Sequence, residues 1–200
     1  MSTGQINFED DILGQRIVEI AAHKSITNIV EVGTWNGLGT TRCILEGLKH
    51  KTTYNFLSFE CNPEMYLQAI DNNKNKLNNN FFIHLGKLVD ENTIDNWFDH
   101  GSLIPDQVMW LREDKVRMSK IPNLSFLLPE KIDFLLLDGG EFSTFYEWRL
   151  MKDRANYVVL DDTKCLKCKA IREEVLNSAE FKILEDNQDH RHGFLIFKKN

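Results

Sequence analysis

The stretch Asn28-Ile-Val-Glu-Val-Gly-Thr-Trp-Asn-Gly-Leu-Gly-Thr-Thr41 decides the fold. It begins as an apolar strand over 28–32, passes through three glycines and continues as a helix over 39–48. Glycine lets a backbone turn tightly and approach a ligand closely, and a helix N-terminus offers free N–H groups to an anion. The segment therefore predicts an α/β domain with a ligand-binding turn after its first strand.

Nearly continuous apolar runs recur along the chain and alternate with helical patterns. Such runs suit the strands of a parallel sheet that is covered on both faces. Two further apolar runs, separated only by a polar loop, indicate an antiparallel pair at the end of the chain. The predicted strands are 28–32, 54–60, 80–85, 132–138, 157–161, 181–184 and 194–197, and the predicted helices are 8–23, 39–48, 63–75, 144–154 and 163–178.

One segment interrupts this alternation. Residues 90–121 hold mixed charges and only a fragmentary helical period, and they make the connection between the third and fourth strands longer than usual. We interpret the chain as a single domain over 1–200 with an insertion at about 90–121. A lid, an oligomer contact and a plain surface elaboration all fit the insertion, and a homodimer is compatible with it.

Composition limits the partners. The 200 residues include 24 Lys plus Arg and 30 Asp plus Glu, which gives a net charge of −6. An acidic chain has no general attraction for nucleic acid or for an anionic membrane. No apolar run approaches the roughly 18 residues of a membrane-spanning helix. The start of the sequence is polar and acidic, unlike a secretion signal, so we expect a cytoplasmic protein.

The spacing of the glycines and the end of the second strand point to the ligand. Gly33, Gly37 and Gly39 form G-x-x-x-G-x-G, which differs from the G-x-G-x-x-G of nicotinamide-binding turns. Glu60 ends the second strand, where a carboxylate can accept hydrogen bonds from both ribose hydroxyls of an adenosine. Since Pro63 follows closely, Glu60 can alternatively be an acid at a helix N-terminus.

Carboxylates also end the fourth and fifth strands. Asp138 follows one apolar run, and Asp161 and Asp162 close the next. Neighbouring parallel strands bring these groups to one rim, where they repel each other unless a cation or protons intervene. Oxygen ligands favour Mg²⁺, Ca²⁺ or Mn²⁺ over zinc. Alternatively, Asp162 caps the following helix and Asp138 orients an amino group of the ligand.

Taken together, the motifs resemble those of class I S-adenosylmethionine (SAM)-dependent methyltransferases, whose first motif is E/D-x-G-x-x-x-G. The acidic strand ends are most similar to the metal-dependent small-molecule O-methyltransferases of the catechol, caffeoyl-CoA and macrocin types. The resemblance implies a Rossmann-like, doubly wound, seven-stranded sheet of order 3-2-1-4-5-7-6 with strand 7 antiparallel. It also implies that SAM is the cofactor and that Mg²⁺, held by Asp138, Asp161 and Asp162, contacts a hydroxyl of a small molecule or sugar.

The resemblance assigns further roles by position. Asp138 and Glu141 are the candidate catalytic residues. Catechol-type enzymes place a lysine base three residues after the aspartate of the fourth strand, and the sugar type often has a histidine there, whereas this chain has Glu141. Glu141 can act as the base if burial raises its pKa, can be a further metal ligand, or can have no role. The candidate cofactor-binding residues are Glu31, Gly33, Thr34, Trp35, Gly37, Gly39, Thr40, Glu60, Gly86 and Asp138.

Two alternatives stay open at this stage. One is a metal-independent methyltransferase of a small molecule or protein, and the other is a non-catalytic Rossmann-like protein that binds a ligand. Lys164, Lys167 and Arg172 are predicted to lie on the solvated face of a helix, with contacts to an acidic acceptor as the alternative.

Overall fold

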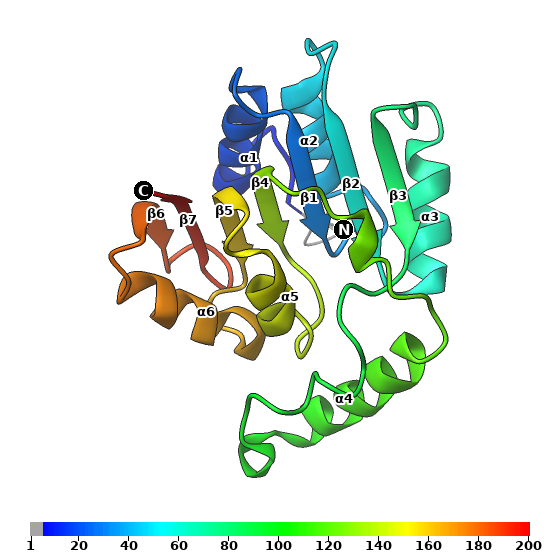
Figure 1. Ribbon diagram of the computed structural model, residues 1–200, viewed down its shortest axis with the longest axis vertical. Coiled ribbons are helices and arrows are strands. Elements are labelled where there is room, and N and C mark those ends of the chain that lie inside the picture. The colour runs from blue at the N-terminus through cyan, green and yellow to red at the C-terminus, as the bar shows by residue number, and fades with distance from the viewer. Residues whose placement is uncertain (1–5) are drawn as a thin grey trace.

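Seven strands form one sheet in the computed structural model, which describes residues 6–200 (Figure 1). Their order is β3-β2-β1-β4-β5-β7-β6, and all neighbouring pairs are parallel except those that β7 makes with β5 and β6. This order confirms the predicted topology. The strands are β1 (Asn28–Val32), β2 (Asn55–Glu60), β3 (Phe81–Leu85), β4 (Ile132–Leu137), β5 (Ala155–Asp161), β6 (Phe181–Asn187) and β7 (Phe194–Lys199).

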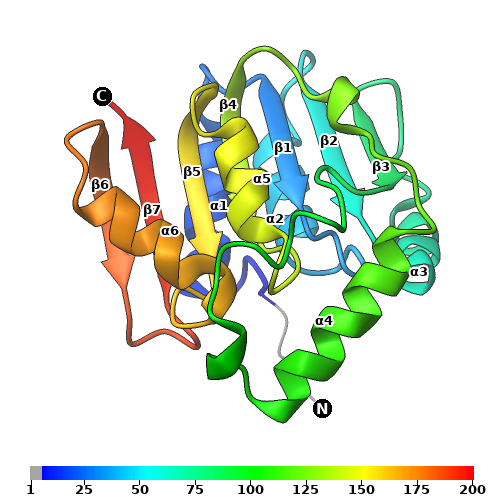
Figure 2. The same cartoon turned by 60° about the horizontal axis from the view of Figure 1, so that its bottom comes forward.

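Helices cover both faces of the sheet. In Figures 1 and 2, α1 and α2 lie behind the sheet, and α5 and α6 lie in front of it. Two large apolar clusters correspond to these two faces, one containing Ile17 and Ile44 and the other Trp148 and Ile171. The helices are α1 (Ile12–Ala22), α2 (Thr40–Leu48), α3 (Pro63–Asn73), α4 (Pro105–Met118), α5 (Thr144–Met151) and α6 (Leu166–Leu176), with short 3₁₀ turns η1 (His100–Ser102) and η2 (Ser125–Leu127).

Strand β4 shows why its apolar run is continuous. Every residue of the strand is buried. Leu135 and Leu137 belong to the cluster on one face, whereas Phe134 and Leu136 belong to the cluster on the other. Because successive side chains of a strand point to opposite faces, a strand covered on both sides needs apolar residues at both its odd and its even positions.

A capping side chain in one case and a backbone turn in the other set where two helices begin. The carboxylate of Asp11 accepts the N–H groups of Leu13 and Gly14, so α1 begins at Ile12 and not at residue 8 as predicted. Helix α6 begins at Leu166, three residues later than predicted, because Asp162 adopts φ +56° and the chain turns before the helix starts. This turn leaves the side chain of Asp162, the residue that follows β5, at the carboxyl end of the sheet.

Helix α4 is the largest departure from the sequence prediction, which placed no helix in 90–121. In Figure 2 it crosses below the sheet, beyond the carboxyl ends of the strands. Only Leu111 and Met118 of this helix are buried, in a small cluster with Ile94 and Phe142. The remaining apolar side chains of α4 are largely exposed, which explains the weak periodicity. No helix within residues 6–200 has the length and apolar character needed to span a membrane.

Candidate functional site

The turn after β1 has a backbone that only glycine accommodates at two positions. Gly33 has φ +94°, and a Cβ there would lie 2.1 Å from the carbonyl oxygen of Asp138. Gly37 has φ +71°, and a Cβ there would lie 2.4 Å from Nδ2 of Asn73. The first glycine thus lets the turn press against the end of β4, and the second lets it press against α3.

Glu60 connects this turn to the end of β2. Its carboxylate is buried and accepts the backbone N–H of Trp35 at 2.7 Å and that of Asn62 at 2.7 Å. Burial raises the pKa of Glu60, and these backbone hydrogen bonds oppose the rise. The carboxylate therefore braces two loops at the carboxyl ends of neighbouring strands, and it also borders the cavity described below.

Glu31, the first residue of the glycine motif, lies beneath the turn. Its carboxylate is fully buried and accepts the hydroxyls of Thr40 at 2.6 Å, Thr41 at 2.8 Å and Ser58 at 2.6 Å. The Ser58 hydroxyl also lies 2.5 Å from that of Thr34. This buried network holds the start of α2 against β1 and β2.

The burial of Glu31 has a consequence for stability. Burial raises its pKa from 4.5 to about 7, against the opposing hydrogen bonds of three hydroxyls. Between these two values the folded chain holds a proton that the unfolded chain has lost. The free energy of unfolding should therefore fall as pH rises through this window, by up to about 1.4 kcal/mol per pH unit for this one group.

Replacing Glu31 by glutamine should remove that share of the pH dependence. We expect urea denaturation at about pH 5.5 and about pH 7 to show a smaller loss of stability in Glu31→Gln than in the wild type. The exposed Glu64 supplies the control, since Glu64→Gln should keep the wild-type slope. Equal slopes in Glu31→Gln and the wild type would show that Glu31 is already ionised at the lower pH.

A cavity of about 560 Å³ opens at the carboxyl ends of β1, β2 and β4. Five of the ten predicted cofactor-binding residues line it, together with the predicted base Glu141. The other five, Glu31, Thr34, Gly37, Gly39 and Thr40, lie in or beneath the turn and are not part of the lining. The lining comprises Val32, Gly33, Trp35, Phe59–Asn62, Gly86–Leu88, Trp110, Glu113, Asp114, Arg117, Met118, Asp138–Glu141, Ser143 and Glu147.

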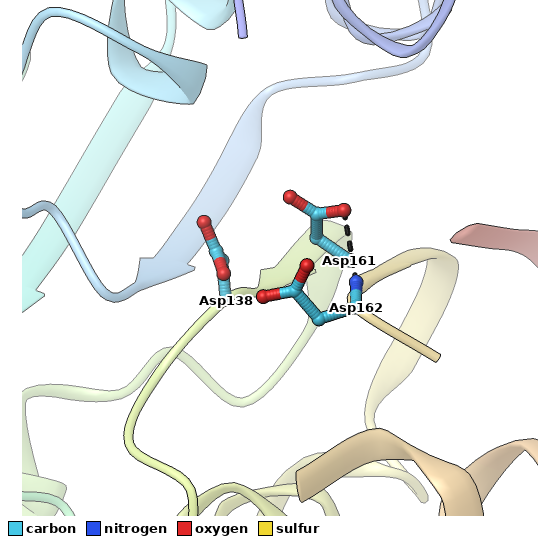
Figure 3. A group of neighbouring side chains, drawn as sticks. All are labelled: Asp138, Asp161 and Asp162. Carbon is cyan, nitrogen blue, oxygen red and sulfur yellow. Dashed lines mark hydrogen bonds between the residues drawn. The ribbon is translucent and has the colours of Figure 1, made fainter. Parts of the chain in front are cut away.

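Three carboxylates converge beside this cavity. Figure 3 shows Asp138 at the end of β4 and Asp161 and Asp162 at the end of β5, with their side chains directed toward one another. One oxygen of each lies within 4.8 Å of the others, and the N–H of Asp162 donates to Asp161 at 2.8 Å. Burial, and then the charges of Asp138 and Asp162, raise the pKa of Asp161 to about 7. Neighbouring parallel strands thus bring these groups to one rim, as expected.

Lys167 also belongs to this cluster, so its predicted position on a solvated face is wrong. Its side chain reaches back from the first turn of α6, and the residue is only 6% exposed. The ammonium nitrogen lies 2.7 Å from Oδ1 of Asp138 and 2.9 Å from Oδ2 of Asp162. Burial disfavours the charge of Lys167, but these carboxylates outweigh it and hold its pKa well above the ordinary value.

Glu141 stands apart from the acidic cluster. Its Oε1 accepts the backbone N–H of Leu166 at 3.1 Å and the amide of Gln107 at 3.3 Å. Within residues 6–200, the group of carboxylates close enough to share a metal ion does not include it. Glu141 therefore connects the cavity wall to α6 and α4, and the role of a further metal ligand receives no support.

The cavity wall also contains residues of α4 and α5 that were not among the predicted site residues. Glu147 is buried in the cavity wall, and burial raises its pKa to about 7. Asp114 and Arg117 reach the same cavity from α4, where they form an ion pair at 2.8 Å. Glu147 stands among aromatic residues in the sequence, and nothing in that pattern singles it out. A lid was one of the interpretations left open for 90–121, and α4 of that segment lines the cavity.

The sheet order with an antiparallel β7, and a cavity at the carboxyl ends of β1, β2 and β4, define the class I SAM-dependent methyltransferase fold. Comparison with known proteins agrees with this assignment. No protein-family model and no curated protein sequence matches the chain. Many solved structures do match it, at low sequence identity.

Three of these structures illustrate the range. The methyltransferase PaMTH1 of Podospora anserina, bound to SAH, matches with a TM-score of 0.63 and 11% identity, over 94% of this chain and 78% of its own. The O-methyltransferase of Bacillus cereus in complex with SAH matches with a TM-score of 0.60 and 13% identity, over 94% and 80%. An rRNA methylase of Streptococcus thermophilus matches with a TM-score of 0.55 and 15% identity, over 94% and 93%.

Proposed function

We propose that this chain is a SAM-dependent methyltransferase that methylates a hydroxyl of a small molecule or sugar. The observation that carries the proposal is the cavity that extends from the glycine turn past Glu60 to Gly86, within a fold whose relatives hold SAH. SAH, S-adenosylhomocysteine, is what SAM becomes after it has given up its methyl group. A cofactor of this kind would lie along the strand ends, with its ribose near Glu60.

The residues of the cavity suit the chemistry of such a transfer. SAM supplies an activated methyl group, so the protein contributes alignment, exclusion of water and removal of the hydroxyl proton. The buried Glu60 carboxylate can accept hydrogen bonds from the ribose hydroxyls, and Asp138 can accept one from the amino group of the cofactor. Glu141 is at the cavity wall and is the proposed proton acceptor for the attacking hydroxyl.

The charge of the cavity bears on the acceptor. Six acidic residues line it, and the basic lining residues are Lys87 and Arg117. An acidic cavity attracts the positively charged sulfonium of SAM and repels a polyanion such as RNA. The fold is shared with an rRNA methylase, but the charge of this cavity favours a neutral or cationic small molecule.

A metal-assisted transfer is the second candidate, favoured by the convergence of Asp138, Asp161 and Asp162. Their oxygens are the donor type that Mg²⁺ prefers, and a bound ion would lower the pKa of an acceptor hydroxyl. Lys167 counts against it, because its ammonium already contacts two of the three carboxylates. With the lysine in this position the cluster does not fit a divalent ion, so no step of the proposed reaction depends on one.

Calorimetric titration of SAM tests the proposal at its first step. We expect saturable binding to the wild type and binding weaker by about 10- to 100-fold in Glu60→Gln, since a hydrogen bond to a charged group contributes about 1.5–3 kcal/mol. Glu64→Gln, an exposed change four residues along the chain from Glu60, should bind like the wild type. Thermal unfolding of each variant shows whether it is folded.

The negative outcomes differ in meaning. Failure of the folded wild type to bind SAM would overturn the proposed function. Binding of SAM without methyl transfer to any of a panel of phenols, catechols and sugars would favour the non-catalytic alternative.

A further inference from the structure

The ammonium of Lys167 occupies a built position inside the acidic cluster. It contacts the end of β4 through Asp138 at 2.7 Å and the end of β5 through Asp162 at 2.9 Å. The lysine is 6% exposed, whereas the side chains of Asp138 and Asp162 are 27% and 23% exposed, so the ammonium is the buried end of both ion pairs. A buried ammonium without carboxylate partners would be strongly disfavoured, so these two contacts hold Lys167 in its position.

The local fold directs this side chain inward. Asp162 adopts φ +56°, which turns the chain sharply after β5, and Cys165 then precedes the first residue of α6. Lys167 follows in the first turn of that helix and reaches back over the strand ends. Exposed lysines lie on either side of it at positions 164 and 169, so one lysine of three is selected for the interior by this turn.

A divalent ion and this ammonium exclude each other. Magnesium binds carboxylate oxygens at about 2.0–2.1 Å. An ion bound to Oδ1 of Asp138 would therefore lie within about 5 Å of the lysine nitrogen, which is 2.7 Å from the same oxygen. Two cations so close in a site shielded from water repel strongly. Arg191 adds a further positive charge that acts on Asp138 and Asp161.

We propose that Lys167 is the resident cation of the Asp138–Asp161–Asp162 cluster and takes the place of a divalent metal. Lys167 is a positioning residue. It is not part of the cavity lining, but it fixes Asp138, which is part of that lining. Its consequence for catalysis, a methyl transfer that needs no divalent ion, rests on the proposed function. The exclusion of metal ions by Lys167 does not depend on the proposed function, and it can be measured without any substrate.

Binding of Mn²⁺, followed by the electron paramagnetic resonance of the free ion, tests this exclusion. We expect the wild type to show no site for Mn²⁺ at submillimolar concentration. Lys167→Met keeps an unbranched apolar stem but removes the charged end of the side chain, and it should create one site that is at least about 10-fold tighter than any in the wild type. The double variant Asp162→Ala with Lys167→Met lacks one ligand oxygen and should lose that site again.

Two matched variants separate charge from packing. Lys167→Arg keeps a cation in the cluster and should exclude Mn²⁺ as the wild type does. Lys169→Met removes an exposed lysine of the same helix and should create no site. A merely structural role of Lys167 would not predict a gain of metal affinity upon its removal.

Two results would overturn the inference. One is a wild-type protein that binds Mn²⁺ tightly and loses it in Asp162→Ala, a test that does not depend on a folded lysine variant. The other is a folded Lys167→Met that gains no site. SAM titration of the same samples keeps the two proposals apart, because loss of SAM binding in the wild type would remove the methyltransferase function and leave the Mn²⁺ result intact.

Discussion

Replacing Gly33 by alanine should destabilise the protein by at least about 3 kcal/mol and abolish SAM binding at the concentrations where the wild type saturates. The added Cβ would lie 2.1 Å from the carbonyl oxygen of Asp138, and the backbone at φ +94° disfavours any side chain. Neither the turn nor the end of β4 can retreat, because the two run side by side as neighbouring elements of the sheet. Urea denaturation, with SAM titration of the folded fraction, measures both effects.

Gly101 supplies the matched control for this change. A Cβ at Gly101 would meet its nearest neighbour, a side-chain oxygen of Asp99, at 3.4 Å, which is ordinary contact. We expect Gly101→Ala to change the free energy of unfolding by less than about 0.5 kcal/mol. A Gly33→Ala protein as stable as Gly101→Ala would contradict the account of the turn.

Replacing Glu141 by glutamine should lower the rate of methyl transfer about 100-fold or more while the affinity for SAM stays unchanged. Its Oε1 is engaged by Leu166 and Gln107, and glutamine can keep those contacts through its own carbonyl oxygen. What glutamine cannot do is accept a proton from the attacking hydroxyl. Single-turnover rates with an acceptor that the wild type methylates, beside calorimetry with SAM, separate the two steps.

Glu113 is the control for this experiment, because it is another glutamate of the cavity wall and lies on α4. Glu113→Gln should keep the rate within a few-fold of the wild type. If Glu141→Gln did so as well, Glu141 would not be the base, and its contacts with α4 and α6 would be its whole role.

The sheet could be predicted from the sequence because burial on two faces leaves a direct trace in composition. β4 is apolar at every position except Asp133, whose carboxylate accepts the backbone N–H groups of Thr27 and Asn28 at the amino end of the sheet. β6 alternates buried and more exposed residues, as an edge strand does, and it runs three residues beyond the prediction to Asn187, past an irregularity between Ile183 and Glu185.

Two features of the site could not be predicted from the pattern of apolar residues. Helix α4 packs only Leu111 and Met118, so its sequence lacks the apolar stripe from which an amphipathic helix is recognised. Lys167 has its acidic partners 29 and five residues away, at Asp138 and Asp162, and only the turn at Asp162 brings them together. A lysine in a charged helix is ordinarily exposed, so composition alone gives the opposite answer.

The glycine motif predicted the site only in part, for a related reason. It located the turn, but Glu31 points into the three hydroxyls beneath that turn, whereas Glu60 borders the cavity. Both are acids at or near the end of a buried strand, and a linear motif does not record which way a side chain is directed. Whether a carboxylate faces ligand or interior depends on partners contributed by separate elements.

The placement of β7 has a consequence for how the chain is assembled during synthesis. β6 meets the sheet only through β7, and β7 alone joins it to β5. Until residues 194–199 are free to fold, the five parallel strands can associate with one another, but β6 has no neighbouring strand with which to form sheet hydrogen bonds. β6 and β7 are therefore expected to join the sheet together, as a hairpin that closes its edge beside the acidic cluster in one step.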